Sequence, residues 1–134
     1  MPVNNQVGES SANREVAIVY DDIKKTRNID SINNFWKHLA NNPVLLQETW
    51  EQFKNSMADG EISALMKELI YIAVSISNNC NYCIHSHTVS AKKLGMTPDM
   101  YNELIDVILM ANKTNSIAIA SGVEVDEQFL CKNR

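Results

Sequence analysis

Apolar side chains recur every three or four residues along most of this 134-residue chain, which is the spacing of helices that bury one face. The pattern starts at Glu15. Residues 1–13 before it are rich in Asn, Ser and Gly and carry little that could be buried. We therefore expect residues 1–13 to form a flexible tail and residues 14–134 to form a single helical domain.

Capping residues divide this pattern into about six predicted helices. Asn42-Pro43 and Thr97-Pro98 each combine a capping side chain with a proline at the first helical position. Gly95 suits the left-handed conformation that ends a helix. The predicted segments run from Glu15 to about Lys25, from Asp30 or Ser31 to about Asn41, from Asn42 to Asp59-Gly60, from Ser63 to a turn near Asn79, from Cys80 to Gly95, and from Thr97 to Ser121-Gly122.

Strand patterns are weak in this sequence. Residues 116–120 and 123–125 are candidates for short extended pieces, and residues 112–115 mark a point where the last helix could break. No run alternates apolar and polar side chains between turn signals, as a half-buried strand does. The predicted fold class is therefore all-α.

The fourth predicted helix is apolar almost all round, which places it in the core or at a subunit interface. Its apolar residues are Ala64, Leu65, Met66, Leu69, Ile70, Tyr71, Ile72, Ala73, Val74 and Ile76. Glu68 lies among them. Because a buried carboxylate without a partner is costly, Glu68 is either paired or protonated, or it shares a polar edge with Lys67 and Ser75. Composition alone leaves a solvated glutamate and a functional one equally open.

Composition and charge narrow the classes of function. At 45% hydrophobic residues, the chain can bury a core without disulfides, so its three cysteines are available for chemistry. The net charge is −4 and the basic residues are scattered, which argues against a nucleic-acid partner. The sequence has no apolar run of transmembrane length and no signal-peptide pattern, so we expect a cytoplasmic protein without a membrane contact. In that reducing compartment, three cysteines favour redox, catalytic or metal-binding use.

Residues 80–87, with the sequence Cys-Asn-Tyr-Cys-Ile-His-Ser-His, concentrate the chemistry. On a helix that starts near Cys80, the side chains of Cys80, Cys83 and His87 share one stripe with the apolar residues that follow. If this helix pairs antiparallel with the one before it, Glu68 is level with residue 90, about 4.5 Å along the axis from His87. We therefore expect Cys80, Cys83, His87 and Glu68 to surround one semi-buried pocket.

This arrangement suits thiol chemistry. Only the thiolate is a strong nucleophile, and a helix N-terminus and a nearby imidazolium both favour it. His87 is placed to take the proton of Cys83. Once Cys83 has attacked a peroxide or a disulfide, Cys80 can resolve the product, while Glu68 orients His87 or relays protons.

The spacing Glu68, eleven residues, Cys80, two residues, Cys83, three residues, His87 resembles the signature of the AhpD-like alkylhydroperoxidase branch of the carboxymuconolactone decarboxylase superfamily. The likeness runs from about residue 17 to residue 122. It implies an all-helical fold, a homo-oligomer of three or six chains, and reduction of hydroperoxides with electrons from a dithiol or protein reductant. It implies that Cys83 attacks the peroxide, that Cys80 resolves the product, and that Glu68 and His87 relay protons, with no bound cofactor.

The chain departs from the best-described members of this branch in one residue of the motif. They carry a histidine immediately before the second cysteine, whereas this chain has Tyr82. A phenol therefore replaces one part of their proton relay, which bears on the rate of peroxide reduction. The lactone decarboxylases of the superfamily lack the cysteine pair, so its presence argues against decarboxylation.

Two other functions remain open for the same residues. Cys80, Cys83 and His87 could bind zinc with Glu68 or a water molecule as the fourth ligand, although a second ligand cluster is not evident. Alternatively, the pair could be a redox sensor that changes the assembly of a non-enzymatic module. We interpret His85 as an exposed histidine and Cys131 as an incidental thiol.

Overall fold

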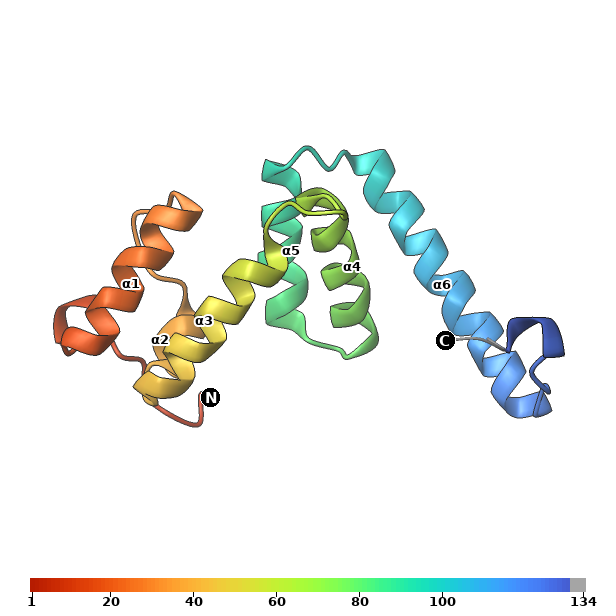
Figure 1. Ribbon diagram of the computed structural model, residues 1–134, viewed down its shortest axis with the longest axis horizontal. Helices are drawn as coiled ribbons and strands as arrows, with labels where there is room; N and C mark the ends of the chain where they lie inside the picture. Colours follow the sequence, from red (N-terminus) through yellow and green to blue (C-terminus); the bar gives the residue numbers. More distant parts are fainter. Residues whose placement is uncertain (131–134) are drawn as a thin grey trace. The chain divides into compact units, whose positions relative to one another are not determined.

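The computed structural model describes residues 1–130, and the regular secondary structure of this part of the chain is helical, without a strand. Its six α-helices and two short 3-10 helices appear in Figure 1. They are η1 (Glu9–Ser11), α1 (Arg14–Arg27), α2 (Asn34–Leu39), α3 (Pro43–Met57), α4 (Ala64–Ser77), α5 (Asn81–Lys93), α6 (Pro98–Ser121) and η2 (Glu127–Phe129). The prediction of an all-α fold of about six helices is confirmed. Cys131 lies outside the described residues.

The chain divides into two compact units, residues 1–58 and the residues from 59 onward. The first unit contains α1, α2 and α3, and the second contains α4, α5 and α6. Each unit has its own group of buried apolar side chains. The single domain over residues 14–134 that the sequence indicates stays a prediction.

Aromatic side chains organise the core of the first unit. The rings of Trp36 and Trp50 meet edge to face with their centroids 5.3 Å apart, and both side chains are almost fully buried. The indole N–H of Trp50 donates a hydrogen bond of 2.7 Å to Asp22, which also forms an ion pair of 2.8 Å with Lys54. A buried indole therefore finds a partner at the edge of the core.

The N-terminal segment contacts the helices of the first unit through polar groups. The backbone N–H of Val7 donates to the carbonyl of Lys37, and the hydroxyl of Tyr20 donates to the carbonyl of Val7. Glu9 forms an ion pair of 2.7 Å with Lys24. Apolar patterning does not reveal such contacts, because main-chain atoms and one charged pair make them. The flexibility expected of residues 1–13 stays a prediction.

The second unit is built on the hairpin of α4 and α5, which lie side by side and antiparallel in Figure 1. The turn between them contains Asn79 at φ 56°, a left-handed conformation that asparagine tolerates better than most residues. Ile72 on α4 and Ala91 on α5 are fully buried between the helices. The hairpin places the C-terminal end of α4 next to the start of α5, where the cysteine pair lies.

Several helix boundaries follow the capping signals. Asn42, Ser63 and Thr97 each accept a hydrogen bond from the backbone N–H three residues ahead. Gly95 and Gly122 have positive φ at the ends of α5 and α6.

Two boundaries differ from the predictions. α2 starts at Asn34 rather than next to Asp30 or Ser31, because Ile32 is buried in the preceding loop and its N–H binds Glu9. α6 continues unbroken through residues 112–120, where a break and an extended piece were candidates. The hydroxyls of Thr114 and Ser116 donate to carbonyls four residues back and are thus satisfied within the helix. Residues 123–125 form neither helix nor strand.

Candidate active site

Cys80 and Cys83 lie at the N-terminus of α5, where the structure joins them in a disulfide with their Cα atoms 5.3 Å apart. Cys80 is the N-cap residue, and its Sγ accepts a hydrogen bond of 3.3 Å from the backbone N–H of Cys83. Its own N–H donates to the carbonyl of Ser75 at the end of α4. The hairpin therefore holds the pair at a helix N-terminus, where the helix dipole favours negative charge on sulfur.

The structure brings Glu68 and His87 together. His87 Nδ1 lies 2.6 Å from Glu68 Oε2, and each residue is only 7% exposed. The antiparallel hairpin makes this contact possible, since it pairs a residue of α4 with one near the middle of α5. Of the two interpretations left open for Glu68, the buried and paired one agrees with the structure.

This contact defines the chemistry of the imidazole. A carboxylate accepts hydrogen bonds, so the neutral ring donates from Nδ1 to Glu68. Nε2 then becomes the nitrogen that can take up a proton. Because Cys83 and His87 are four residues apart on α5, their side chains lie on the same side of that helix. The Glu68–His87 pair can therefore act as a base for the Cys83 thiol once the disulfide is reduced.

Tyr71 is a third member of this cluster, although the apolar pattern of the sequence marks it only as one more apolar residue. Its ring stacks on the imidazole of His87 with the centroids 3.6 Å apart and the planes 20° from parallel. Ser75, also buried, donates its hydroxyl to the carbonyl of Tyr71. The helical spacing of 68, 71 and 75 places the three residues on one side of α4. That spacing was the signal in the sequence that could have identified Tyr71 as part of the cluster. It does not stand out, because the neighbouring residues of this helix are apolar.

The other aromatic and histidine residues of the motif face solvent. Tyr82 is 42% exposed. His85 is exposed and its Nδ1 lies 2.8 Å from the carbonyl of Asn81, one turn back on the helix. These positions agree with a stripe of Cys80, Cys83 and His87 on the inner side of α5 and a more exposed side beyond it.

The described residues contain no group of three or more His, Cys, Asp or Glu side chains arranged to hold a metal ion. Between residues 1 and 130, no helix is long and apolar enough to cross a membrane. An apolar hollow of about 320 Å³ lies between α4 and α6, lined by residues that include Met66, Ile70 and Val107. None of the four motif residues lines it.

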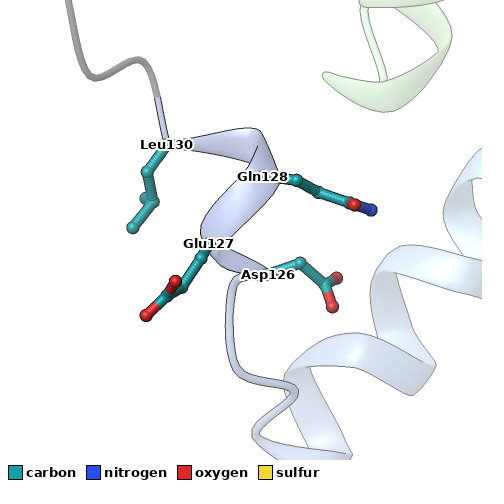
Figure 2. Close-up of a pocket in the computed structure, with 4 residues that line it drawn as sticks. All are labelled: Asp126, Glu127, Gln128 and Leu130. Atoms are coloured by element: carbon teal, nitrogen blue, oxygen red, sulfur yellow. The ribbon is translucent and has the colours of Figure 1, made fainter.

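A second, open hollow of about 670 Å³ lies at η2. Figure 2 shows Asp126 and Gln128 projecting to one side of this short helix and Glu127 and Leu130 to the other. These side chains do not converge on a common point. The hollow therefore adds nothing to the chemistry of the cysteine pair.

Comparison with known proteins agrees with this geometry. A family model described as carboxymuconolactone decarboxylase family matches residues 45–123, more than half of the chain. The solved structure of the alkylhydroperoxidase AhpD core from Rhodospirillum rubrum is 44% identical in sequence, and the match covers 98% of this chain and 99% of that chain with a TM-score of 0.94. No protein with a curated description matches the sequence. The chain belongs to the AhpD-like branch of the carboxymuconolactone decarboxylase family.

Proposed function

We propose that this protein is a thiol-dependent peroxidase that reduces hydroperoxides through Cys80 and Cys83. The observation that carries the proposal is the disulfide of these residues at the N-terminus of α5, on the same helix as a buried imidazole that is paired with a carboxylate. A chain whose solved structure is described as an alkylhydroperoxidase core shares 44% of its residues over almost the whole length. The fold, the cysteine pair and the contact between the imidazole and the carboxylate therefore all support thiol-dependent reduction of hydroperoxides.

In the first step, the reduced enzyme attacks the peroxide. His87 Nε2 accepts the proton of the Cys83 thiol, while Glu68 holds Nδ1 and stabilises the imidazolium that forms. The Cys83 thiolate then attacks the terminal oxygen of the hydroperoxide and breaks the O–O bond. Cys83 becomes a sulfenic acid, and the organic fragment leaves as an alcohol after taking up a proton, for which the imidazolium is the donor.

In the second step, Cys80 attacks the sulfur of the Cys83 sulfenic acid. The S–S bond forms, and the hydroxyl group leaves as water with the proton of the Cys80 thiol. The result is the disulfide that the structure contains. A dithiol, free or on a protein, then reduces this disulfide by thiol exchange and is itself oxidised to a disulfide. A cytoplasmic location would keep such a reductant available.

We also propose that the active form is a homo-oligomer of three or six chains. The number of chains is the one that the family resemblance implies, and the support for an interface is a group of exposed apolar side chains on the second unit. Exposed apolar residues of α4 and α6 include Met66, Ile70, Val74, Val107, Leu109, Met110, Ile117 and Ile119. Apolar patches of this kind on a soluble chain mark surfaces that contact another protein.

The test of the peroxidase proposal is consumption of an organic hydroperoxide by purified protein with a dithiol as the reductant. We expect the Cys83→Ser variant to fall to the background rate, because the nucleophile is lost. We expect Cys80→Ser to complete the first step and to stall as a Cys83 sulfenic acid or mixed disulfide. Serine is chosen at residue 80 because its hydroxyl can still accept the capping hydrogen bond.

The matched control is Cys131→Ser, which removes the remaining thiol and is expected to keep the wild-type rate. Wild-type turnover by the double variant of Cys80 and Cys83 would contradict the proposal. A redox sensor would instead change its oligomer size on oxidation without turnover. A zinc site would show about one equivalent of metal per chain in protein purified without a chelator.

A further inference from the structure

The aromatic contact between Tyr71 and His87 is closer and flatter than ordinary core packing requires. The two rings are nearly parallel, with a tilt of 20° and centroids 3.6 Å apart. Aromatic pairs in proteins commonly have centroids 4.5–7 Å apart and often meet edge to face. The phenol of Tyr71 therefore covers one face of the imidazole, in addition to the hydrogen bond that Glu68 makes with its edge.

These two contacts constrain different motions of the imidazole. The hydrogen bond to Glu68 determines which nitrogen points at the carboxylate. It leaves the ring able to tilt about the line of that bond. A parallel stack opposes this tilt, since any rotation out of the plane brings the two rings into collision or separates them. Together the contacts hold the imidazole plane, and therefore Nε2, in one direction.

We propose that Tyr71 is a positioning residue of the thiol site, which fixes the plane of the His87 ring and stabilises its imidazolium form through the face of the phenol. The second effect follows from the charge distribution of an aromatic ring, whose face is negative and attracts a cation placed over it. In the proposed cycle the imidazolium forms when His87 takes the proton of Cys83 and is consumed when the leaving alcohol takes that proton. The proposal rests on the thiol role of Cys83 and His87 that is proposed above.

The position of Tyr71 explains how α4 supplies both contacts. Tyr71 follows Glu68 by three residues, so both side chains project from neighbouring turns on the same side of the helix. The hydroxyl of the buried Ser75 donates to the carbonyl of Tyr71 and is satisfied within α4. One helix therefore carries the carboxylate and the ring, and the hairpin presents both to α5.

The experiment compares three variants of the prereduced, full-length protein. Tyr71→Phe keeps the stacked ring, Tyr71→Leu keeps only apolar bulk, and Tyr101→Leu removes a tyrosine that packs on the core of the same unit from α6. The first measurement is the rate at which iodoacetamide alkylates Cys83, located by mass spectrometry. It reports thiolate formation and needs no peroxide.

We expect Tyr71→Leu to lower the alkylation rate of Cys83 about 3- to 10-fold, the size of an aromatic or cation-ring contact. Tyr71→Phe should restore the rate to near that of the wild type, and Tyr101→Leu should leave it unchanged. The rate of the first oxidation by a hydroperoxide should follow the same order. An unchanged rate in Tyr71→Leu, or an equal loss in Tyr71→Phe, would overturn the proposal.

A spectroscopic measurement on the wild-type protein keeps the proposal falsifiable if Tyr71→Leu does not fold. The ring current of a stacked phenol shifts the carbon-bound protons of His87 upfield in the NMR spectrum. Tyr71→Phe should keep this shift, and its absence from the wild-type spectrum would overturn the stack. If the variants show these effects on alkylation but the wild-type protein never reacts with a hydroperoxide, only the peroxidase proposal is contradicted.

Discussion

At the scale of single residues, the main cost in this site is the burial of a carboxylate and an imidazole. Either group buried alone would strongly destabilise the folded protein, because polar groups removed from water need hydrogen-bond partners. Glu68 and His87 satisfy each other across 2.6 Å, and Tyr71 covers one ring face. A buried pair of this kind costs less when it is complete than when either partner is removed. That asymmetry makes the substitution of Glu68 informative.

We predict that Glu68→Gln lowers the rate of hydroperoxide reduction on the order of 100-fold, the lower range for loss of acid-base assistance. Glutamine has nearly the same shape but cannot neutralise the imidazolium that forms when Cys83 ionises. The measurement is the second-order rate constant for oxidation of the reduced protein. Glu61→Gln, which changes an exposed glutamate of the same unit, is the control. A Glu68→Gln rate equal to that of the control would contradict the proposed relay.

A second prediction concerns the acid stability of the first unit. The ammonium of Lys54, followed by the indole N–H of Trp50, holds the pKa of Asp22 below its ordinary value. A carboxyl with a depressed folded-state pKa stabilises the fold above its unfolded pKa of about 4 and loses this contribution as pH falls through the folded value.

The variant Asp22→Asn should therefore unfold at a lower urea concentration than the wild type at pH 7. This difference should shrink as the pH is lowered below about 4. Asp106→Asn, at an exposed position on α6, should show a smaller difference at pH 7. If the difference in unfolding urea concentration between the wild type and Asp22→Asn instead grows as the pH falls, the ionised Asp22 carboxylate does not stabilise the fold as predicted.

Helical spacing in the sequence identifies the motif residues of this site but not every residue that contacts them. Spacing on a helix was enough to place Cys80, Cys83 and His87 on one stripe, because helical periodicity is local. The contact of His87 with Glu68 needed only one further assumption, the antiparallel hairpin. Tyr71 was missed because a tyrosine in an apolar helix has the same pattern whether it packs in a core or stacks on an imidazole.

At the scale of helices, the turn between α4 and α5 determines where the cysteines lie. Asn79 adopts a left-handed conformation there, directly before Cys80. Such a conformation costs about 1–2 kcal/mol for most residues and is readily adopted by glycine. The turn also leads the N–H of Cys80 to the carbonyl of Ser75. The local backbone at Asn79 is therefore part of how the site is positioned.

We predict that Asn79→Ala lowers the free energy of unfolding of the oxidised protein by about 1 kcal/mol, because alanine tolerates positive φ poorly. Asn79→Gly should retain the wild-type value or exceed it, since glycine adopts this conformation without strain. Urea unfolding of the three proteins is the measurement. If alanine and glycine are equivalent at this position, the turn does not impose the strain that its φ angle indicates.

Helix ends were predictable where a capping side chain acts alone. Asn42, Ser63 and Thr97 cap as their sequences indicate. The start of α2 was not predictable, because a contact between Ile32 and Glu9, 23 residues away in sequence, decides it. The continuity of α6 was hidden by the polar residues Asn112 to Asn115, which resemble a loop but have exposed positions on a long helix.

At the scale of the whole molecule, the exposed apolar side chains of α4 and α6 are the feature that a single chain leaves unexplained. The hollow of about 320 Å³ between these helices is bordered by Met66, Ile70 and Val107, each about half exposed or more. The amphipathic pattern that predicted these helices cannot distinguish a side chain buried in its own core from one buried against another chain.

We predict that the wild-type protein has a solution mass of three or six times the 15.1 kDa of one chain. The double variant Ile70→Glu with Val107→Glu should move toward the mass of a single chain, because it places charges in the apolar surface that a partner would cover. Ile18→Glu, at an exposed apolar residue of α1, is the matched control. Size-exclusion chromatography with light scattering measures the masses, and a monomeric wild type would contradict the proposed assembly.

The proposed function requires that Cys80 and Cys83 exchange electrons with a hydroperoxide. Its most direct test is a titration of free thiols in the fully reduced protein before and after one equivalent of an organic hydroperoxide, with mass spectrometry of the proteolysed chain. We predict the loss of two thiols per chain, one equivalent of alcohol, and a Cys80–Cys83 crosslink, with Cys131 still reduced. Unchanged thiols, or oxidation confined to Cys131, would contradict the proposed peroxidase function.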